Sequence, residues 1–340
     1  AVTNAFNTVL YTGNGGTQSI TSLNFAPDFT WIKERNNPIN HLLFDTIRGA
    51  GRYLSSNNTL NQPSPQLATL SSFNNNGFSV GTDGGVNGNN DTYVAWNWKA
   101  AGYANTFNVL ENGTVTSSST ASGAGITAGS DTVGSGLDVW EVSANRDAGF
   151  SIVNYKNTSG DGAVNVGHGL NQEPDMIIQK STNSSAIPWV VYHREVGTGK
   201  YLSLNSTSTP STSASVMSLV DSTSFSSNWS NTAYEFINYC FVSIPGYSKV
   251  GSYTGTGATG NVVYTGFEPA FVMVKPSSLA DNWLIYDNKR GDDIALFANL
   301  SNADTTYAGR LELNSNGFTL NTTNSGWNGS GQTYIFLAIA

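Results

Sequence analysis

A set of landmark residues occurs three times along this 340-residue chain at nearly constant spacing. Each copy has a proline six residues before a lysine: Pro27 and Lys33, Pro174 and Lys180, Pro269 and Lys275. An Asp or His follows twelve or thirteen residues later, and an Asn twelve residues after that: Asp45 and Asn57, His193 and Asn205, Asp287 and Asn299. Repetition at a fixed spacing indicates a fold built from similar units, so we expect three related domains.

Two segments of each copy have the length and composition of β-strands. They are short apolar or aromatic runs at 29–33 and 41–44, 176–180 and 189–192, and 271–275 and 283–286. The dipeptides Asn76-Gly77 and Asn316-Gly317 predict hairpins, and no window of eleven or more residues has helical periodicity. The sequence therefore predicts an all-β protein made of tandem antiparallel β-sandwich, jelly-roll-like domains in three related copies.

The copies are unevenly spaced, and this sets the predicted domain boundaries. Lys33 and Lys180 are 147 residues apart, whereas Lys180 and Lys275 are 95 apart. The additional residues lie between the first two copies and are rich in Ser, Thr and Gly, which is typical of linkers. We expect sandwiches at residues 1–103, 150–246 and 247–340, with a linker or extended arm at 104–149.

The charge content limits the classes of partner. Charged residues make up 11% of the chain, against roughly 25% in an average soluble protein, and the formal net charge is −8. A polar, weakly charged surface without a basic stripe excludes nucleic acid as a partner. No stretch approaches the roughly 20 apolar residues of a membrane span, and the first residues lack the features of a secretion signal. We therefore expect no membrane insertion.

Catalytic groupings are weak in this sequence. A glycosidase needs two carboxylates roughly 5 to 10 Å apart, and the chain offers only loose candidates: Asp45 with Glu34, and Asp287 with Asp292 or Asp293. The favoured interpretation is that Asp45 and Asp287 hold a turn after a strand and pair with Arg48 and Arg290. The second copy has His193-Arg194 in place of this pattern, so a binding site formed by the Asp and Arg would be lost there.

Metal ligands are also sparse. The three histidines, His41, His168 and His193, do not lie at metal-ligand spacing. The Gly-rich run 83–91 contains oxygen ligands suited to calcium but lacks the spacing of an EF-hand, and a loop without metal is the favoured interpretation. We predict no catalytic residue, no metal and no cofactor.

Several longer strings resemble a repeat of virion proteins from tailed bacteriophages, especially marine ones. They lie at residues 31–33 with 45–49, 142–153, 167–170, 244–255, 266–275, 316–318 and 334–338, and so cover nearly the whole chain. Proteins with this repeat are described as tail-fibre or uncharacterised structural proteins and share no agreed active site. In this chain roughly residues 118–141 interrupt the pattern, and we expect this insert to contact a neighbouring subunit.

The resemblance implies two functions. The first is a non-enzymatic structural protein, made in the host cytoplasm and exposed on the virion surface as a fibre subunit or capsid decoration. Its partners would be itself, as a trimer in a fibre, and other virion proteins. The second is a host-recognition module in which Trp229 and Trp327, embedded in Asn, Ser and Gly, contact a surface glycan. The repeat-signature residues are expected to be structural: Asp45, Arg48, Asn57, His193, Asn205, Asp287, Arg290 and Asn299.

Overall fold

The fold is almost entirely β-sheet. The computed structural model describes residues 2–102, 106–109, 115–118, 137–157, 164–229 and 234–340. Strands make up 43% of the structure and helices 3%, which confirms the predicted fold class. Within the described ranges no helix has both the length and the hydropathy needed to cross a membrane.

Each copy has an inner sheet that contains four equivalent strands in the same order. In copy 1 the order is β1 (Phe6–Thr12), β7 (Thr92–Trp98), β3 (Phe29–Glu34) and β4 (Leu42–Asp45). In copy 2 the equivalent strands are β11 (Phe150–Asn157), β18 (Glu235–Phe241), β13 (Met176–Ser181) and β14 (Val190–His193). In copy 3 they are β19 (Ser248–Thr254), β27 (Thr333–Ile339), β21 (Phe271–Pro276) and β22 (Leu284–Asp287). These neighbours are antiparallel, as the sequence predicts.

Further strands extend these sheets or lie across them. The inner sheets continue into β15 (Lys200–Ser203) and β16 (Ser211–Thr212) in copy 2, and β23 (Ile294–Phe297) and β24 (Thr305–Thr306) in copy 3. The outer sheets are β2 (Gln18–Ile20), β6 (Gly77–Val80) and β5 (Leu70–Asn74); β12 (Val164–Gly167) and β17 (Ser224–Ser227); and β20 (Asn261–Tyr264), β26 (Gly317–Leu320) and β25 (Leu311–Asn314). Two short helices, α1 (Gly84–Asn87) and α2 (Ser325–Asn328), occupy equivalent places in copies 1 and 3.

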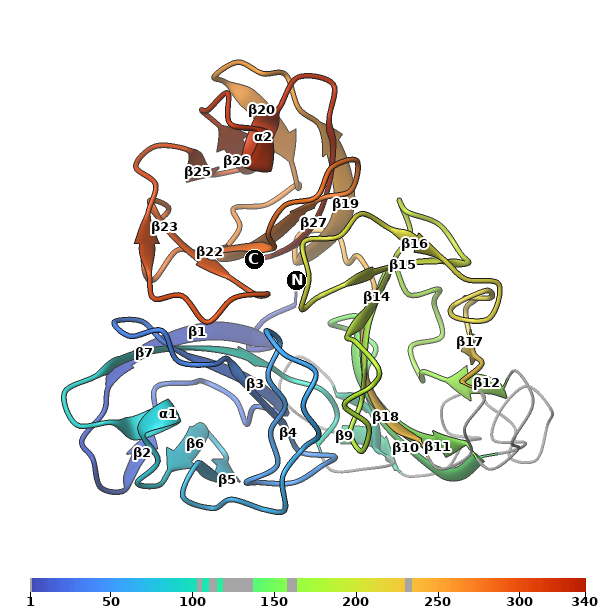
Figure 1. The fold of residues 1–340 in the computed structure, drawn as a ribbon. Coiled ribbons are helices and arrows are strands. Elements are labelled where there is room, and N and C mark those ends of the chain that lie inside the picture. The colour runs from blue at the N-terminus through green and yellow to red at the C-terminus, as the bar shows by residue number, and fades with distance from the viewer. Residues whose placement is uncertain (1, 103–105, 110–114, 119–136, 158–163, 230–233) are drawn as a thin grey trace.

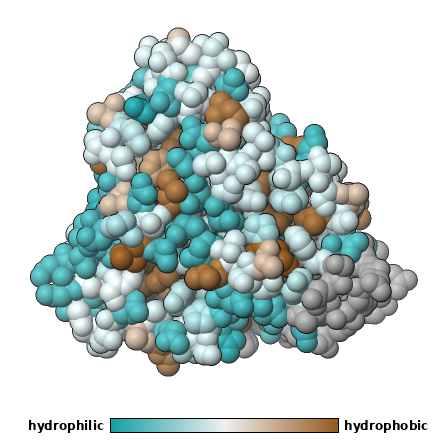
Figure 2. Space-filling model, in the orientation of Figure 1, coloured by the Kyte–Doolittle hydropathy of each residue, from teal (hydrophilic) through white to brown (hydrophobic). Residues whose placement is uncertain are grey.

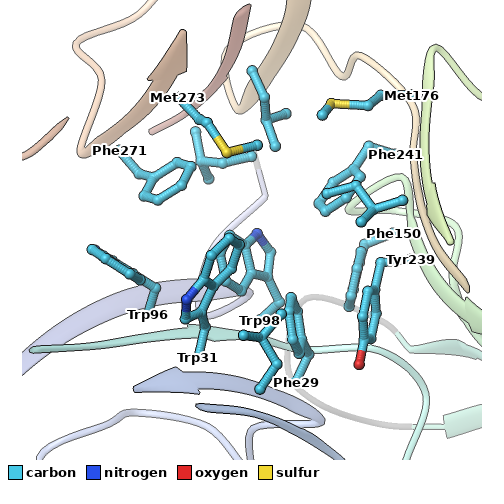
Figure 3. Close-up of a cluster of buried hydrophobic side chains, with 14 of the residues drawn as sticks. Phe29, Trp31, Trp96, Trp98, Phe150, Met176, Tyr239, Phe241, Phe271 and Met273 are labelled. Carbon is cyan, nitrogen blue, oxygen red and sulfur yellow. The ribbon is translucent and has the colours of Figure 1, made fainter. Parts of the chain in front are cut away.

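The three copies form a ring of three lobes around one centre (Figure 1). Each lobe has its own core between its inner and outer sheets. A further core fills the centre of the ring, where aromatic and methionine side chains from all three inner sheets point toward one another (Figure 3). Phe29 stacks on Tyr239 of copy 2 with 4.0 Å between ring centroids, and Trp96 meets Phe271 of copy 3. The three repeated β-sandwich copies are therefore lobes that share a central core.

The shared core explains the composition of the repeated apolar runs. All residues of β3, β13 and β21 are buried, because one face of each strand lies in its own sandwich and the other in the centre of the ring. Along β21, for example, Phe271 and Met273 lie in the central core, while Val272 and Val274 lie in the core of copy 3. A strand buried on both faces has a continuous apolar sequence instead of an alternating one.

The segment expected to be a linker at 104–149 belongs in part to the sheet of copy 2. Strand β10 (Leu137–Asn145) pairs along β11, and β8 (Thr106–Val109) and β9 (Val115–Ser118) extend the same sheet beyond it. The linker prediction is wrong for these strands, because β10 pairs with the edge of β11, β8 with β10, and β9 with β8, which satisfies backbone groups of each strand. Of the expected insert 118–141, residues 119–136 lie outside the described residues.

The predicted hairpins are present, but their glycines have a different role from the one expected. Strands β5 and β6 are antiparallel, and Asn74 lies opposite Gly77, so Gly77 is the first residue of β6 rather than a turn residue. A Cβ on Gly77 would lie 1.7 Å from the carbonyl oxygen of Ile20 on β2, and one on Gly317 would lie 1.9 Å from that of Val263. Glycine is required because a third strand passes close to the hairpin.

We predict that Gly77→Ala weakens the outer sheet of copy 1. The free energy of unfolding, measured by chemical denaturation, should fall by more than about 1 kcal/mol, because the new Cβ displaces β2 from β6. Gly84→Ala in α1 is the control, since a Cβ there meets nothing within 4 Å, and it should be neutral or stabilise by up to about 1 kcal/mol. Equal stability of the two variants would contradict the close approach of β2.

Candidate functional site

The Asp and Arg of the repeat lie buried at a junction between copies. Asp45 accepts hydrogen bonds from the backbone N–H of Arg48 (2.8 Å) and from its Nε (2.6 Å), and the two side chains are 0% and 2% exposed. Tyr239 of copy 2 donates its hydroxyl to Asp45 Oδ2 at 2.7 Å and accepts from Arg48 Nη2 at 3.1 Å. The predicted turn and ion pair are confirmed, and they also join copy 1 to copy 2.

An equivalent arrangement joins copy 3 to copy 1. Asp287 accepts from the backbone N–H and the Nε of Arg290 at 2.8 and 2.6 Å. Its Oδ2 also accepts from Trp96 Nε1 of copy 1 at 3.0 Å, and the Arg290 guanidinium lies 5.6 Å from the centroid of the Trp96 ring. Strand register places Trp96 and Tyr239 at equivalent positions, so both acids meet a polar aromatic side chain of the next copy.

Copy 2 departs from this pattern, and the residue of copy 3 at the position of Trp96 and Tyr239 differs as well. The position equivalent to Trp96 and Tyr239 is Leu337 in copy 3, which offers no hydrogen-bond donor. His193 replaces the acid there and approaches the carbonyl oxygen of Phe336 (3.3 Å), while Val196 lies at the Arg position and packs against the central core. The His193 departure seen in the sequence therefore reflects an apolar neighbour.

The Asn of each copy holds an aromatic residue that reaches into the preceding copy around the ring. Asn57, Asn205 and Asn299 each accept through Oδ1 from a backbone N–H, at 3.0, 3.0 and 2.8 Å. The residues they hold bond to backbone carbonyls across the three junctions: His41 to Phe297 and Leu300, Trp189 to Ser55 and Asn58, and Trp283 to Ser203. Copy 1 thus contacts copy 3, copy 3 contacts copy 2, and copy 2 contacts copy 1, which closes the ring.

The three landmark lysines are buried at the ends of their strands. Lys33, Lys180 and Lys275 are 0% exposed, and each Nζ donates to the carbonyl oxygen of the following residue, at 2.6, 2.8 and 2.6 Å. Burial lowers the pKa of each to about 8. These ammonium groups satisfy strand-end carbonyls, which is a structural role.

The two tryptophans expected to contact glycan differ in burial: Trp327 is buried and Trp229 is partly buried. Trp327 is 6% exposed, and its Nε1 donates to Tyr286 at 2.8 Å. Its counterpart in copy 1 is the fully buried Val86, so this is a core position although the surrounding sequence is rich in Gly and Asn. Trp229 is partly buried, donates to Gln179 Oε1 at 3.0 Å and stacks on Phe236. The expectation of an exposed side chain is therefore wrong for Trp327, whereas the glycan contact of Trp229 stays a prediction.

The Gly-rich run 83–91 contains the N-cap of α1, the whole of α1 and the turn after it. Asp83 Oδ1 accepts from the N–H of Gly85 at 2.7 Å and caps the helix, as Asn324 does for α2. An uncharged Asn therefore performs the same role in copy 3. Among the described residues no three His, Cys, Asp or Glu side chains converge in a way that could hold a metal ion.

A polar groove lies between copies 1 and 2 and is here called the junction groove. It has two adjoining hollows of about 400 and 350 Å³, both lined by Arg52, Gln62, Pro65 and Glu235. The larger hollow is also lined by Glu141 and by Asn154, which is 5% exposed. The Nδ2 of Asn154 donates to Glu141 Oε2 at 3.0 Å and to Glu235 Oε1 at 2.9 Å.

Sequence reasoning did not identify the junction groove, although the repeat contains a signal for it. The positions equivalent to Asn154 are Leu10 and Ser252, and those equivalent to Glu235 are Thr92 and Thr333. Aligning the three copies would therefore have shown that copy 2 alone has an amide and a carboxylate at these two positions. Glu141 comes from β10, which was interpreted as part of a linker.

We predict that Arg48→Met strongly destabilises the protein. It leaves the buried Asp45 carboxylate without its ionic partner, so the free energy of unfolding should fall by about 3 to 5 kcal/mol, as measured by urea denaturation. The triple variant Asp45→His, Arg48→Val, Tyr239→Leu copies the residue types of the junction between copies 2 and 3. Its free energy of unfolding should fall less than that of Arg48→Met. A single variant as stable as the wild type would show that the pair does not hold the junction.

Three buried histidines predict a loss of stability in mild acid. Burial lowers the pKa of His41 to about 3 and those of His168 and His193 to about 4, whereas an unperturbed histidine titrates near pH 6.5. As the pH falls from about 6.5 to 4, the unfolded chain takes up protons at these sites and the folded chain does not. The free energy of unfolding should therefore decrease across this window, as measured by denaturant titrations at successive pH values.

The variant His193→Asn isolates one histidine. The N–H of Glu195 donates to His193 Nδ1, and an Asn oxygen can accept the same bond. Three histidines contribute to the pH dependence of the free energy of unfolding, so this variant should remove about one third of their combined contribution. Buried carboxyls with raised pKa values, such as Asp28, are common to both proteins and do not affect the difference. If the free energy of unfolding changed with pH as steeply in the variant as in the wild type, His193 would not be buried in its neutral form.

Comparison with known proteins gives a family match over nearly the whole chain. A family model described as a domain of unknown function, DUF7483, matches residues 2–140 and again 120–340. A repeated match is consistent with the repeated lobes. No curated protein is significantly similar to the chain.

Proposed function

The chain belongs to the DUF7483 family, a domain of unknown function, and we propose that it is a non-enzymatic structural protein on the surface of a tailed-phage particle, as a fibre subunit or capsid decoration. The observation that carries the proposal is the closed ring. The repeated Asp, Arg, Lys and aromatic residues are buried, and they and the repeated Asn are bonded within or between copies. Their chemistry supports rigidity rather than turnover.

The outer surface supports the same role. The face seen in Figure 2 is mostly hydrophilic, with hydrophobic atoms confined to small patches, and charged residues make up only 11% of the chain. Polar surfaces of low charge suit packing against neighbouring copies and other particle proteins. Self-association, as a trimer in a fibre, is part of this proposal.

A second candidate function is recognition of a glycan on the host surface. The buried environment of Trp327 and the half-buried one of Trp229 do not favour it. The junction groove favours glycan recognition, because it is a hollow lined by carboxylate, amide and guanidinium groups.

We predict that antibody against this protein labels intact phage particles. Immunogold microscopy should place the label on the head for a capsid decoration or on the tail for a fibre subunit, and light scattering of the purified chain should show a stable oligomer in the second case. Particles lacking the corresponding gene are the control. Absence of label from particles, together with absence of the protein from purified virions by mass spectrometry, would refute the proposal.

A further inference from the structure

We propose that the junction groove binds a neutral or amino-sugar-containing saccharide. This inference deepens the second candidate function and names the site and the chemical class of its ligand. The groove lies where Gly49, Ala50 and Arg52 of copy 1 face Glu141, Asn154 and Glu235 of copy 2.

The size of the groove fits more than one sugar ring. Its two hollows, about 400 and 350 Å³, each lie within the usual range of small-molecule sites. They share Arg52, Gln62 and Glu235, so a chain of linked rings could run from one hollow into the next. Pro63 and Pro65 line the second hollow and give it apolar surface for the C–H face of a ring.

The lining groups match hydroxyl chemistry. Glu141 and Glu235 are hydrogen-bond acceptors, while the Arg52 guanidinium and the Gln62 amide are donors. Arg48 also lines the groove; its Nη1 has a long contact of 3.5 Å with Gln62 Oε1. A hydroxyl group both donates and accepts, so a ligand with adjacent hydroxyls can satisfy both kinds of group, and bonds to charged partners are the stronger ones.

A buried acceptor at the groove lacks a partner. Asn154 is more than nine-tenths buried, and although its Nδ2 bridges the two glutamates, no group in the described part of the chain donates to its Oδ1. An unsatisfied buried polar atom is costly and uncommon in native proteins. This oxygen is not accessible to solvent, so a ligand hydroxyl donates to it only when the Asn154 amide turns toward the groove, and the same ligand must then donate to the glutamate that Nδ2 releases.

The polar residues of the groove are not required by the repeated fold. Copies 1 and 3 build the same positions of the sheet with Leu10 and Thr92, and with Ser252 and Thr333. Glu141 belongs to β10, a strand without a counterpart beside β1 or β19 in the described sheets. The acidic and amide groups therefore gather at one junction only, as expected of a site added to a repeated scaffold.

The charge of the groove selects the class of saccharide. Among the charged residues that line the groove, Arg48 is already paired with Asp45, which leaves two glutamates and Arg52, so the lining is acidic on balance. Saccharides with carboxylate or phosphate groups would be repelled, whereas neutral sugars are accepted and an amino sugar gains an ionic contact with a glutamate.

The test is a glycan array of bacterial surface oligosaccharides in neutral, amino-sugar and acidic sets, probed with the purified full chain. Wild type should bind members of the neutral or amino-sugar sets. The double variant Asn154→Leu, Glu235→Thr should bind at least about tenfold more weakly, yet fold normally by thermal melting, because copy 1 has Leu and Thr at these positions. Trp229→Phe is the matched control and should keep wild-type binding.

Three results would overturn the proposal: no binding to any member of the array, binding confined to acidic members, or equal binding by wild type and the folded double variant. Loss of binding in Trp229→Phe with retention in the double variant would place the site elsewhere. Because the array uses purified protein, its outcome is independent of particle labelling. Labelled particles without glycan binding refute the groove alone, and glycan binding without labelled particles refutes the phage role alone.

Discussion

The structure depends on burying both faces of three inner sheets. One face of each sheet is covered by its own outer sheet, and the other can be covered only by the other two copies. A copy on its own would expose large aromatic side chains such as Trp96, Trp98 and Phe271, which together represent a large loss of hydrophobic stabilisation. The central core therefore makes the three copies interdependent, although each has the strand order of a complete sandwich.

The centre is filled by compensating choices of side-chain size. In copy 1 the large Trp31 lies beside the smaller His41, and Trp31 Nε1 donates to His41 Nδ1 at 2.9 Å. The equivalent pairs are Ile178 with Trp189 in copy 2 and Met273 with Trp283 in copy 3, where the larger residue lies at the other position. The combined size of each pair is thus similar. In each copy His41, Trp189 or Trp283 still directs a ring N–H at a neighbouring copy. Close-packed interiors tolerate such exchanges better than changes in total volume.

Much of the fold could be predicted from the sequence because the landmarks are the junction contacts themselves. Asp45 with Arg48 was correctly interpreted as a turn and an ion pair, since both residues come from one short segment. The ring was not predictable in the same way: strands buried on both faces, such as β21, have the same apolar sequence whether a sheet or a neighbouring copy covers them. Glu141, Asn154 and Glu235 come from three strands, and only the sheet register brings them together. Trp327 was misjudged because its Gly-rich and Asn-rich surroundings are typical of exposed turns.

Joining three similar lobes in one chain removes a restriction that symmetry imposes on assemblies of identical subunits. In a homotrimer every substitution appears at all three junctions, so a pair of glutamates bridged by an amide would occur three times around the ring. Here each junction has changed separately, and β10 was added to one sheet only. The molecule therefore has a defined orientation about its pseudo-threefold axis, and within the described residues the arrangement of Glu141, Asn154 and Glu235 occurs at one junction instead of three. Avidity for a repeated ligand would then come from the number of molecules displayed together, and not from the ring itself.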